Sequence, residues 1–466
     1  MSGYRKFLSS KRIKATQSGI DVPVDAINGK LFPWQRDIVH WSLKTGRSAL
    51  FEDCGLGKTC QQLAWADELI RRAGVNRVLI LCPLAVAQQT LAEASRFAIQ
   101  SPVNVCREAS EVEAGITIAN YERLHKFDTA VFDAVVPDES SILKSYTGKT
   151  KRELISAFKH CRFKLACTAT PAPNDLLELG NHAEFLEVMP SNEMIARWFI
   201  ADSMHAGHYR LMKHAARDYW KWVTTWAVSL SSPSDLGHDD AGFKLPPLSI
   251  EEIVVDSNDN NPGDGWLFSN EPINATTIHR EKRQSAEVRA ERVAELVNSD
   301  KQPWVVWCDL NVEADNLERL IPDAVEVRGS DSTAKKEESL MAFSRGEVRV
   351  IITKPDIAGF GLNWQHCRRV AFIGLSYSFE KFYQAVRRCW RFGQTEPVKV
   401  FVISTEAEHC ISRQVWQKQS THNSLKSGIV EAVREAQLAS MYGRRELKGY
   451  DPQMQMEIPQ WLLSKA

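Results

Sequence analysis

The stretch EDCGLGKTC, residues 52–60, carries the clearest chemical signal in the sequence. It follows the apolar run SALF and opens a segment of helical periodicity, which is the context that a phosphate-binding loop requires. Backbone N–H groups beside glycines can close on phosphate oxygens, and a helix N-terminus adds partial positive charge. Lys58 would reach the β- and γ-phosphates, while the hydroxyl of Thr59 would bind Mg²⁺. The predicted nucleotide-binding residues of this loop are Gly55, Leu56, Gly57, Lys58 and Thr59.

One position of this loop departs from the strict Walker pattern, which has glycine where this chain has Glu52. The alternative interpretation is a strand–turn–helix junction that binds no ligand. We favour nucleotide binding because the G-x-G-K-T run stands directly between a predicted strand and a predicted helix.

A second candidate site is the stretch FDAVVPDESS, residues 132–141, in which an apolar run ends in two adjacent acids. Taken alone, it could be a strand that leaves the core through a turn, since Pro, Asp and Ser favour turns. With a phosphate loop upstream, we expect Asp138 to hold Mg²⁺ and Glu139 to polarise the attacking water as a general base. Open α/β sheets bind ligands at the carboxyl ends of their strands, where this pair would lie.

The elements that must position these residues alternate between short apolar runs and longer amphipathic ones. This α/β rhythm runs from about residue 30 to 185 and resumes at about 280, which predicts two mostly parallel sheets covered on both faces. Between them lies a Trp-rich segment of helical periodicity that ends in Pro, Gly and Asp clusters. We therefore expect an α/β chain organised as a basic N-terminal arm (1–29), domain one (30–185), a helical insert and linker (186–250), domain two (251–405) and a helical C-terminal tail (406–466).

Bulk composition narrows the class of protein. The counts of Lys+Arg and of Asp+Glu are both 58, which excludes attraction of the whole surface to nucleic acid and leaves only a local basic cleft. Ten cysteines include no C-x-x-C pair, a pattern that suits reduced thiols better than a disulfide framework or a zinc site. No apolar run approaches membrane-spanning length, so we expect a cytoplasmic protein without membrane contact.

Five motifs in order carry a family resemblance. GLGKTCQ, PDESS and LACTATPAPND in the first half are followed by GFGLNWQ (359–365) and QAVRRCWRFGQ (384–394) in the second. The chain resembles a superfamily-two helicase of the SWI/SNF-type branch of double-stranded-DNA translocases. The particular residues of its motifs are similar to those of helicase-like proteins of bacteriophages and prophages. The resemblance implies two RecA-like P-loop domains in tandem, hydrolysis of ATP with Mg²⁺ between them, and a nucleic-acid partner, with double-stranded DNA the expected one.

The resemblance also implies roles around the nucleotide. Gln35 would recognise adenine, with Phe32 or Trp34 beside the base, although an N-terminal helix that merely packs on the sheet would look the same. Gln384 would contact the nucleotide or the opposite domain. Two arginines three residues apart would reach the γ-phosphate from the other domain. These are Arg388 and Arg391, whereas Arg387 falls outside their register and is expected to be a surface charge or a DNA contact.

Coupling between ATP and nucleic acid is implied for Thr168 and Thr170. Ser141 stands where superfamily members often have His, which alters the usual link from that position. Nucleic-acid contacts are implied for Thr353, Lys354 and Asn363, each of which could instead be an ordinary strand-end or turn residue.

Two questions stay open in the sequence: what the Trp-rich insert does, and which function the whole protein performs. Trp222 and Trp226 interleave with basic residues, which fits a phosphate clamp, but their spacing of four favours a buried helix face. The function we expect is an ATP-driven DNA translocase. The alternatives are an ATP-gated nucleic-acid clamp, or a motor subunit of a restriction/modification or phage replication complex, without strand separation.

Overall fold

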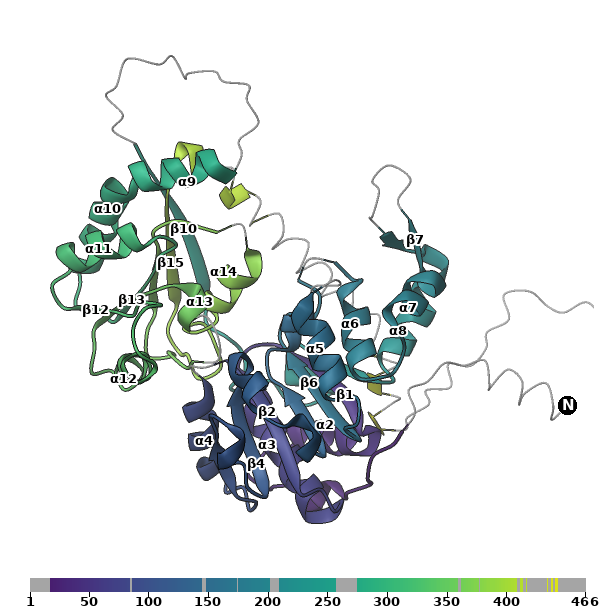
Figure 1. Ribbon diagram of the computed structural model, residues 1–466. Coiled ribbons are helices and arrows are strands. Elements are labelled where there is room, and N and C mark those ends of the chain that lie inside the picture. The colour runs from purple at the N-terminus through teal and green to yellow at the C-terminus, as the bar shows by residue number, and fades with distance from the viewer. Residues whose placement is uncertain are drawn as a thin grey trace, which may run out of the picture.

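The computed structural model describes residues 17–83, 86–144, 148–173, 175–201, 209–256, 275–358, 362–376, 378–408 and 411–413, together with residues 416, 434, 437, 438, 441 and 442. These residues form two α/β lobes, lobe 1 near the N-terminus and lobe 2 in the second half (Figure 1). The fold class predicted from the sequence is confirmed: each lobe is built on one parallel sheet.

The sheet of lobe 1 has seven strands in the order β3-β4-β2-β5-β6-β1-β9. All of its neighbouring strands pair in parallel, as strands joined by crossover helices must. The strands are β1 (Arg47–Glu52), β2 (Arg77–Cys82), β3 (Val103–Val105), β4 (Gly115–Asn120), β5 (Ala134–Pro137), β6 (Phe163–Thr168) and β9 (Ala227–Leu230).

Helices cover both faces of this sheet. Alternate residues of one strand point to opposite faces, so Leu50 joins one core cluster while Ala49 and Phe51 join the other. The first cluster holds α2 (Pro33–Thr45), α3 (Lys58–Arg72) and α4 (Ala87–Arg96), and the second holds α5 (Lys149–Ala157), α6 (Glu178–Phe185), α7 (Ser191–Trp198) and α8 (Ala216–Val223).

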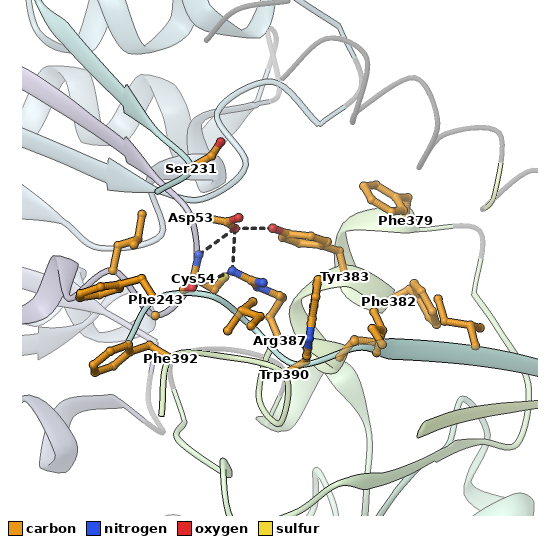
Figure 2. Close-up of a pocket in the computed structure, with 16 residues that line it drawn as sticks. Asp53, Cys54, Ser231, Phe243, Phe379, Phe382, Tyr383, Arg387, Trp390 and Phe392 are labelled. Carbon is orange, nitrogen blue, oxygen red and sulfur yellow. Dashed lines mark hydrogen bonds and ion pairs between the residues drawn. The ribbon is translucent and has the colours of Figure 1, made fainter. Parts of the chain in front are cut away.

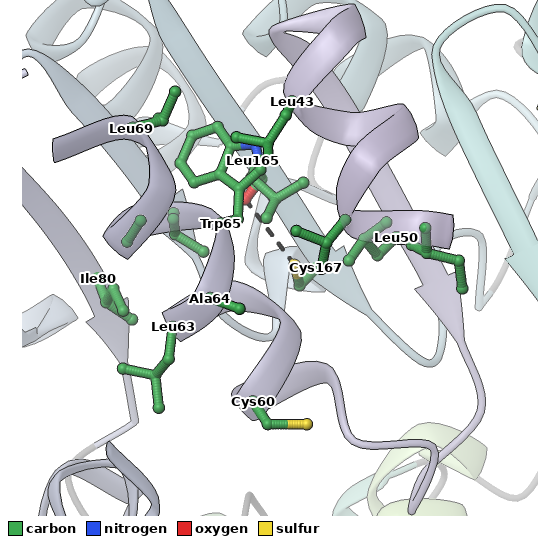
Figure 3. Close-up of a cluster of buried hydrophobic side chains, with 14 of the residues drawn as sticks. Leu43, Leu50, Cys60, Leu63, Ala64, Trp65, Leu69, Ile80, Leu165 and Cys167 are labelled. Atoms are coloured by element: carbon green, nitrogen blue, oxygen red, sulfur yellow. Dashed lines mark hydrogen bonds between the residues drawn. The ribbon is translucent and has the colours of Figure 1, made fainter. Parts of the chain in front are cut away.

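Packing of α3 fixes where the phosphate loop points. Trp65 and Leu69 of this helix lie against Leu43 of α2 and Leu165 of β6, and all four are buried (Figure 3). Burying a large apolar side chain stabilises the fold by roughly 1.5–3 kcal/mol. The first turn of α3 is therefore held firmly at the carboxyl end of β1.

The border between the first domain and the insert differs from the expected position. We placed residues 186–250 outside domain one, but Ala227–Leu230 pair in parallel with β1 as strand β9 at the edge of the first sheet. Periodicity could not reveal this, because a four-residue strand after a Trp-rich helix has too few positions to show alternation. The insert within lobe 1 is thus shorter and carries the ribbon β7 (Phe199–Ala201) and β8 (Tyr209–Leu211).

The tryptophans of the insert belong to the core. Trp222 and Trp226 are buried, and Trp198 stacks on Trp222 with ring centroids 4.7 Å apart. The packing interpretation therefore holds for these rings, and a phosphate clamp built on them does not.

Lobe 2 contains a six-stranded parallel sheet in the order β10-β15-β14-β11-β13-β12. Helices α10 and α11 lie on one face, and α13 and α14 lie on the other (Figure 1). Its elements are β10 (Leu248–Val255), α9 (Ala275–Gln284), α10 (Ala286–Asn298), β11 (Trp304–Trp307), α11 (Asn311–Leu320), β12 (Ala324–Glu326), α12 (Thr333–Ser344), β13 (Val350–Thr353), α13 (Pro355–Ala358), β14 (Arg369–Phe372), α14 (Phe379–Val386) and β15 (Val398–Thr405).

Short 3₁₀ helices connect these elements: η1 (Val24–Ala26), η3 (Ala109–Glu111), η4 (Tyr121–Lys126), η5 (Thr129–Val131), η6 (Ser140–Lys144), η7 (Lys213–Ala215), η8 (Pro233–Leu236) and η9 (Glu406–Glu408). The predicted N-terminal arm and helical tail lie largely outside the described residues. Within the tail, Gln437 accepts a hydrogen bond from the backbone N–H of Ser229 on β9, 3.0 Å away. None of the described helices is both long and apolar enough to cross a membrane.

Candidate nucleotide-binding and hydrolysis site

The phosphate loop connects β1 to α3, as the sequence predicts. Gly55 and Gly57 have φ angles of +89° and +82°, a region that side-chain-bearing residues rarely adopt. Space also requires glycine: a Cβ on Gly57 would lie 2.4 Å from Gln35 Nε2, and one on Gly55 would lie 2.8 Å from the backbone nitrogen of Phe392 in lobe 2. The loop is thus closely contacted by α2 and by lobe 2 at its two glycines.

Lys58 lies at the centre of the loop. Its Nζ donates to the carbonyl oxygens of Glu52 and Asp53, at 2.9 and 3.2 Å. Burial acts to lower the pKa of Lys58, but the negative groups around it, among them Glu139 and Asp138, outweigh burial and raise that pKa. Lys58 is therefore charged and held within its own loop, ready to exchange carbonyl oxygens for phosphate oxygens.

The acid pair lies at the carboxyl end of β5, two strands from the loop. The backbone N–H of Asp138 continues the ladder to Leu81, and Gln62 Nε2 donates to Asp138 Oδ1 at 2.7 Å. Glu139 has a φ angle of +56°, a conformation that costs a non-glycine residue about 1–3 kcal/mol and that persists mainly at functional sites. This left-handed turn ends the strand and lets both carboxyls face the loop.

Burial governs the protonation of this pair. It raises the pKa of Glu139 to about 7, and the charge of Asp138 acts in the same direction against Lys58 and Arg388. Burial also raises the pKa of Asp138, although the hydrogen bond from Gln62 opposes it. A carboxyl with a pKa near 7 is well matched to accept a proton at neutral pH.

The two threonines for which the sequence predicts a coupling role connect the acid pair to lobe 2. Thr168 Oγ1 donates to Glu139 Oε2 at 3.4 Å, and the backbone N–H of Thr170 donates to Thr168 Oγ1 at 3.1 Å. Thr170 Oγ1 then donates to Glu380 Oε1 of α14, also at 3.4 Å. Glu380 receives a further ion pair from Lys144, which follows the acid pair in the chain. A continuous polar chain thus leads from Glu139 to the second lobe.

Ser141 takes no part in this chain, since its hydroxyl makes no hydrogen bond to another described residue. A histidine from another element lies beside the residue that follows the acid pair. His182 of α6 has Nε2 3.1 Å from Ser140 Oγ and Nδ1 3.3 Å from the carbonyl oxygen of Glu178. Burial lowers the pKa of His182 to about 4, so the ring is neutral. Because the carbonyl can only accept, Nδ1 carries the proton and Ser140 donates to Nε2.

Sequence reasoning missed His182, because a lone histidine in an amphipathic helix carries no distinguishing pattern. The topology brings α6 against η6, where Asn181 Nδ2 also donates to the carbonyl oxygens of Leu143 and Lys144. Only this packing identifies His182 as a neighbour of the acid pair.

The segment that directly follows α14 carries the predicted arginines. The positive charge of Arg388 lowers the pKa of both Asp138 and Glu139, against the larger effect of burial. Arg388 Nη1 and Arg391 Nη1 both donate to the carbonyl oxygen of Leu362, at 3.3 and 2.8 Å. Both amide atoms of Gln384 are buried and have no hydrogen-bond partner among the described residues. A buried unpaired amide is costly, so this side chain fits a ligand or water that completes the site.

Arg387 corrects an expectation. We took it for a surface charge or a DNA contact, but it is 3% exposed and lies against the phosphate loop of the opposite lobe (Figure 2). Its Nη2 lies 3.0 Å from Asp53 Oδ1 and donates to the carbonyl oxygen of Cys54 at 2.7 Å. The helix ends at Val386, so helical spacing from Arg388 does not apply to this residue.

The predicted adenine-recognising residues lie at the start of α2. Gln35 is buried; its Oε1 accepts from the backbone N–H of Phe32 and its Nε2 donates to the carbonyl oxygen of Leu56, so it braces the phosphate loop here. Phe32 is 46% exposed and meets Phe392 of lobe 2 edge to face, whereas Trp34 is buried in the core. Of the two aromatics, only Phe32 is accessible to a base.

The three predicted nucleic-acid residues fall in different environments. Thr353 is buried and donates to the carbonyl oxygen of Val327 at 3.2 Å, so its side chain serves the core of lobe 2. Lys354 is half-buried and lines a small cavity of about 30 Å³ at the carboxyl end of that sheet. Asn363 is half-buried and accepts a hydrogen bond from the backbone of Gln365 at 3.4 Å.

The residues present suit Mg²⁺ only together with a nucleotide. The described part of the chain contains no group of three or more His, Cys, Asp or Glu side chains able to hold a metal ion. Mg²⁺, however, is usually held by one or two protein oxygens plus substrate phosphates and waters. The hydroxyl of the half-buried Thr59, next to Lys58 in the chain, and the carboxylate of Asp138, whose charge acts on Lys58, are such oxygens.

Proteins that are similar over most of the chain are distant in sequence. Protein p41 of Acyrthosiphon pisum secondary endosymbiont phage 1 is 22% identical over 86% of this chain and 98% of that protein. ATP-dependent helicase YqhH of Bacillus subtilis is 22% identical over 80% of this chain and 75% of that protein. Among solved structures, the SWI2/SNF2 ATPase core of Sulfolobus solfataricus in complex with dsDNA is 18% identical and superimposes with a TM-score of 0.41, covering 91% of this chain and 99% of that one.

Two family domains match the chain in the order of its lobes. The SNF2-related domain matches residues 34–214, which extends past the expected end of domain one at 185, and the helicase conserved C-terminal domain matches residues 288–393. These matches contain the phosphate loop and acid pair in one lobe, and Arg388 and Arg391, which follow α14, in the other. The chain therefore belongs to the SNF2-related ATP-dependent helicases, with a helicase conserved C-terminal domain as its second lobe.

Proposed function

We propose that this chain hydrolyses Mg-ATP between its two lobes and couples that hydrolysis to movement along double-stranded DNA. The observation that carries the proposal is the polar chain from Glu139 through Thr168 and Thr170 to Glu380. It joins the residue that would act on ATP to the opposite lobe, which is what a motor needs and what a simple nucleotide store does not.

The phosphate loop would bind the triphosphate. Its glycines adopt the left-handed conformation in which backbone N–H groups could turn to phosphate oxygens, and Lys58 would exchange the carbonyl oxygens of Glu52 and Asp53 for the β- and γ-phosphates. Thr59 and Asp138 would hold Mg²⁺, which would neutralise phosphate charge when bound. Phe32 would lie beside the base, and Gln35 would act through the loop that it braces.

Hydrolysis would use groups from both lobes. Glu139 would accept a proton from the attacking water, and Arg388 and Arg391 would approach the γ-phosphate once they leave the carbonyl oxygen of Leu362. An arginine supplied in this way contributes about 10³–10⁵ in rate. Gln384 would complete its hydrogen bonds with the nucleotide or with water.

DNA would bind at the carboxyl ends of the strands of lobe 2, beside Lys354 and Asn363. The burial of Thr353 supports the strand-end interpretation for that residue. DNA contacts to phosphate are electrostatic, so they weaken steeply as salt rises.

ATPase measurements with no nucleic acid, single-stranded DNA, duplex DNA and RNA test this proposal. We expect duplex DNA to stimulate turnover, and stimulation to fall as salt is raised. One rate under all conditions would make the DNA-motor proposal wrong. A triplex-displacement assay then separates a translocase from an ATP-gated clamp, because only a translocase ejects the third strand in an ATP-dependent way.

A further inference from the structure

A cavity of about 340 Å³ lies between the lobes on the side of the phosphate loop that faces the linker (Figure 2). Its walls are mostly apolar and aromatic, with Phe243 from the linker and Trp390 from lobe 2 among them. Four polar side chains nevertheless line it: Asp53 from the loop, Ser231 from lobe 1, and Tyr383 and Arg387 from lobe 2. Asp53 contacts both Tyr383 and Arg387. Lys58, Thr59 and Asp138, which are proposed to bind phosphate and Mg²⁺, do not line this cavity, although Gly55 and Leu56 of the same loop do.

The contacts among these side chains meet at one atom, the Oδ1 oxygen of Asp53. Asp53 Oδ1 accepts the hydroxyl of Tyr383, pairs with Arg387 Nη2 at 3.0 Å, and accepts the backbone N–H of Cys54 at 2.9 Å. Arg387 also donates to the carbonyl oxygen of Cys54 at 2.7 Å. Arg387 is 3% exposed, so the ion pair is screened little by water.

The same loop segment also holds Lys58 in the absence of phosphate. Lys58 Nζ donates to the carbonyl oxygen of Asp53, while Arg387 binds the Asp53 carboxylate and the next carbonyl oxygen along the chain. Lobe 2 is therefore attached to the segment whose shape must change when Lys58 turns to a triphosphate. This attachment is separate from Arg388 and Arg391, which bind within their own lobe.

We propose that Asp53, Tyr383 and Arg387 form an interlobe latch that docks lobe 2 on the phosphate loop before ATP binds, with Tyr383 and Arg387 as positioning residues for turnover. The proposal rests on the ATPase activity of the family and adds to it a device that sets how much of the free enzyme is closed. If only a fraction of the enzyme is in the closed state that binds ATP, the apparent Kd for ATP equals the intrinsic Kd divided by that fraction.

A latch of this kind affects the KM for ATP more than it affects kcat. Without it, the open state is favoured and ATP must close the lobes, so KM rises; at saturating ATP the lobes close and most of kcat returns. A merely structural role would instead reduce the fraction of folded enzyme, which lowers kcat and leaves KM unchanged.

The test is a double-mutant cycle of Asp53→Asn and Arg387→Gln, with KM and kcat measured for each. We expect each single variant to raise KM about tenfold and the double variant to raise it no further, since the two residues act through one contact. Arg368→Gln is the matched control, because it breaks an exposed ion pair with Glu396 within lobe 2. Multiplicative effects in the double variant, or a lowered kcat with unchanged KM, would overturn the latch.

A second measurement needs no ATP turnover. Fluorescent labels at the exposed positions Gln88 on α4 and Glu338 on α12 report energy transfer between the lobes without nucleotide. We expect lower transfer in Arg387→Gln and in Tyr383→Phe, which removes one hydroxyl and preserves the core, than in wild type. Equal transfer in wild type and both variants would overturn the latch, and this result does not depend on whether DNA stimulates the enzyme.

Discussion

Thr170 of lobe 1 donates a hydrogen bond to Glu380 of lobe 2 across 210 residues of sequence. One hydrogen bond further back, Thr168 contacts the carboxylate of Glu139. The residue proposed to activate water is thus two side chains away from the second lobe, so a change in its protonation or position can be transmitted between lobes without a long pathway.

Glu139→Gln should abolish turnover while ATP binding remains. The amide keeps the shape of the side chain but cannot accept the proton of water, and loss of a general base costs about 10²–10⁴ in rate. Single-turnover hydrolysis and equilibrium binding of ATP measure the two effects. The exposed Glu122→Gln is the control in the same lobe. Normal turnover in Glu139→Gln would show that another group is the base.

The ATPase rate should fall as pH is lowered through about 7. Burial raises the pKa of Glu139 to that value, and only the ionised carboxylate can accept a proton, so activity belongs to the high-pH side. Burial also raises the pKa of Glu52 to about 7, which makes Glu52→Gln the necessary control. We expect Glu52→Gln to keep the pH profile of kcat. If kcat no longer depended on pH near 7 in Glu52→Gln, the titrating group would be Glu52 and not Glu139.

Glu52→Gln should also change how stability depends on pH. A carboxyl whose pKa is raised by folding stabilises the fold below its unfolded pKa, near 4.5, and this contribution is lost as pH rises through about 7. Glu52→Gln has no carboxyl to titrate, so its free energy of unfolding does not lose this contribution as pH rises. The difference in free energy of unfolding, variant minus wild type, should therefore be larger at pH 8 than at pH 5, by about 3 kcal/mol at most. Urea unfolding of lobe 1 at both pH values measures it, and an equal difference at the two values would contradict burial as the cause.

Thr170→Val should separate basal from DNA-stimulated hydrolysis. It removes the hydroxyl that reaches Glu380 but leaves the Glu139–Thr168 contact in place. We expect basal turnover within about twofold of wild type and most of the stimulation by duplex DNA to be lost, since a coupling free energy is typically about 1–3 kcal/mol. Thr224→Val is the control, because it removes a buried hydroxyl that bonds only within the insert. Full stimulation in Thr170→Val would exclude this contact from coupling.

Ser140→Ala and His182→Gln should weaken the same structural unit. Ser140 donates to the neutral ring of His182, and removing either partner leaves a buried polar atom unpaired at a cost of about 1–3 kcal/mol. We therefore expect each variant to lower the urea midpoint of lobe 1 and to reduce kcat through the adjacent Glu139. The exposed His125→Ala serves as control. Wild-type stability and kcat in both variants would mean that the contact does not support the acid pair.

The local elements were largely predictable from the sequence. GITIAN corresponds to β4 and FKLACT to β6, because buried parallel strands are nearly continuous apolar runs bounded by turns. The helix after the phosphate loop begins at Lys58 as expected. Periodicity did not predict the short strand β9. Its position depends on the free edge of β1, with which it pairs in the folded sheet.

The sequence by itself determined which residues are candidates for the chemistry: Lys58, Thr59, Asp138 and Glu139 stand in the pattern that predicts a phosphate loop and an acid pair, whatever the packing around them. Tertiary structure alone decided the partners of these residues. Arg387 binds Asp53 across the cleft and His182 supports Ser140 from α6, because each contact joins segments whose separation in sequence carries no periodic signal. Motifs follow local backbone geometry, whereas contacts between lobes and between a helix and a distant turn arise only when the sheets have formed and the lobes have met.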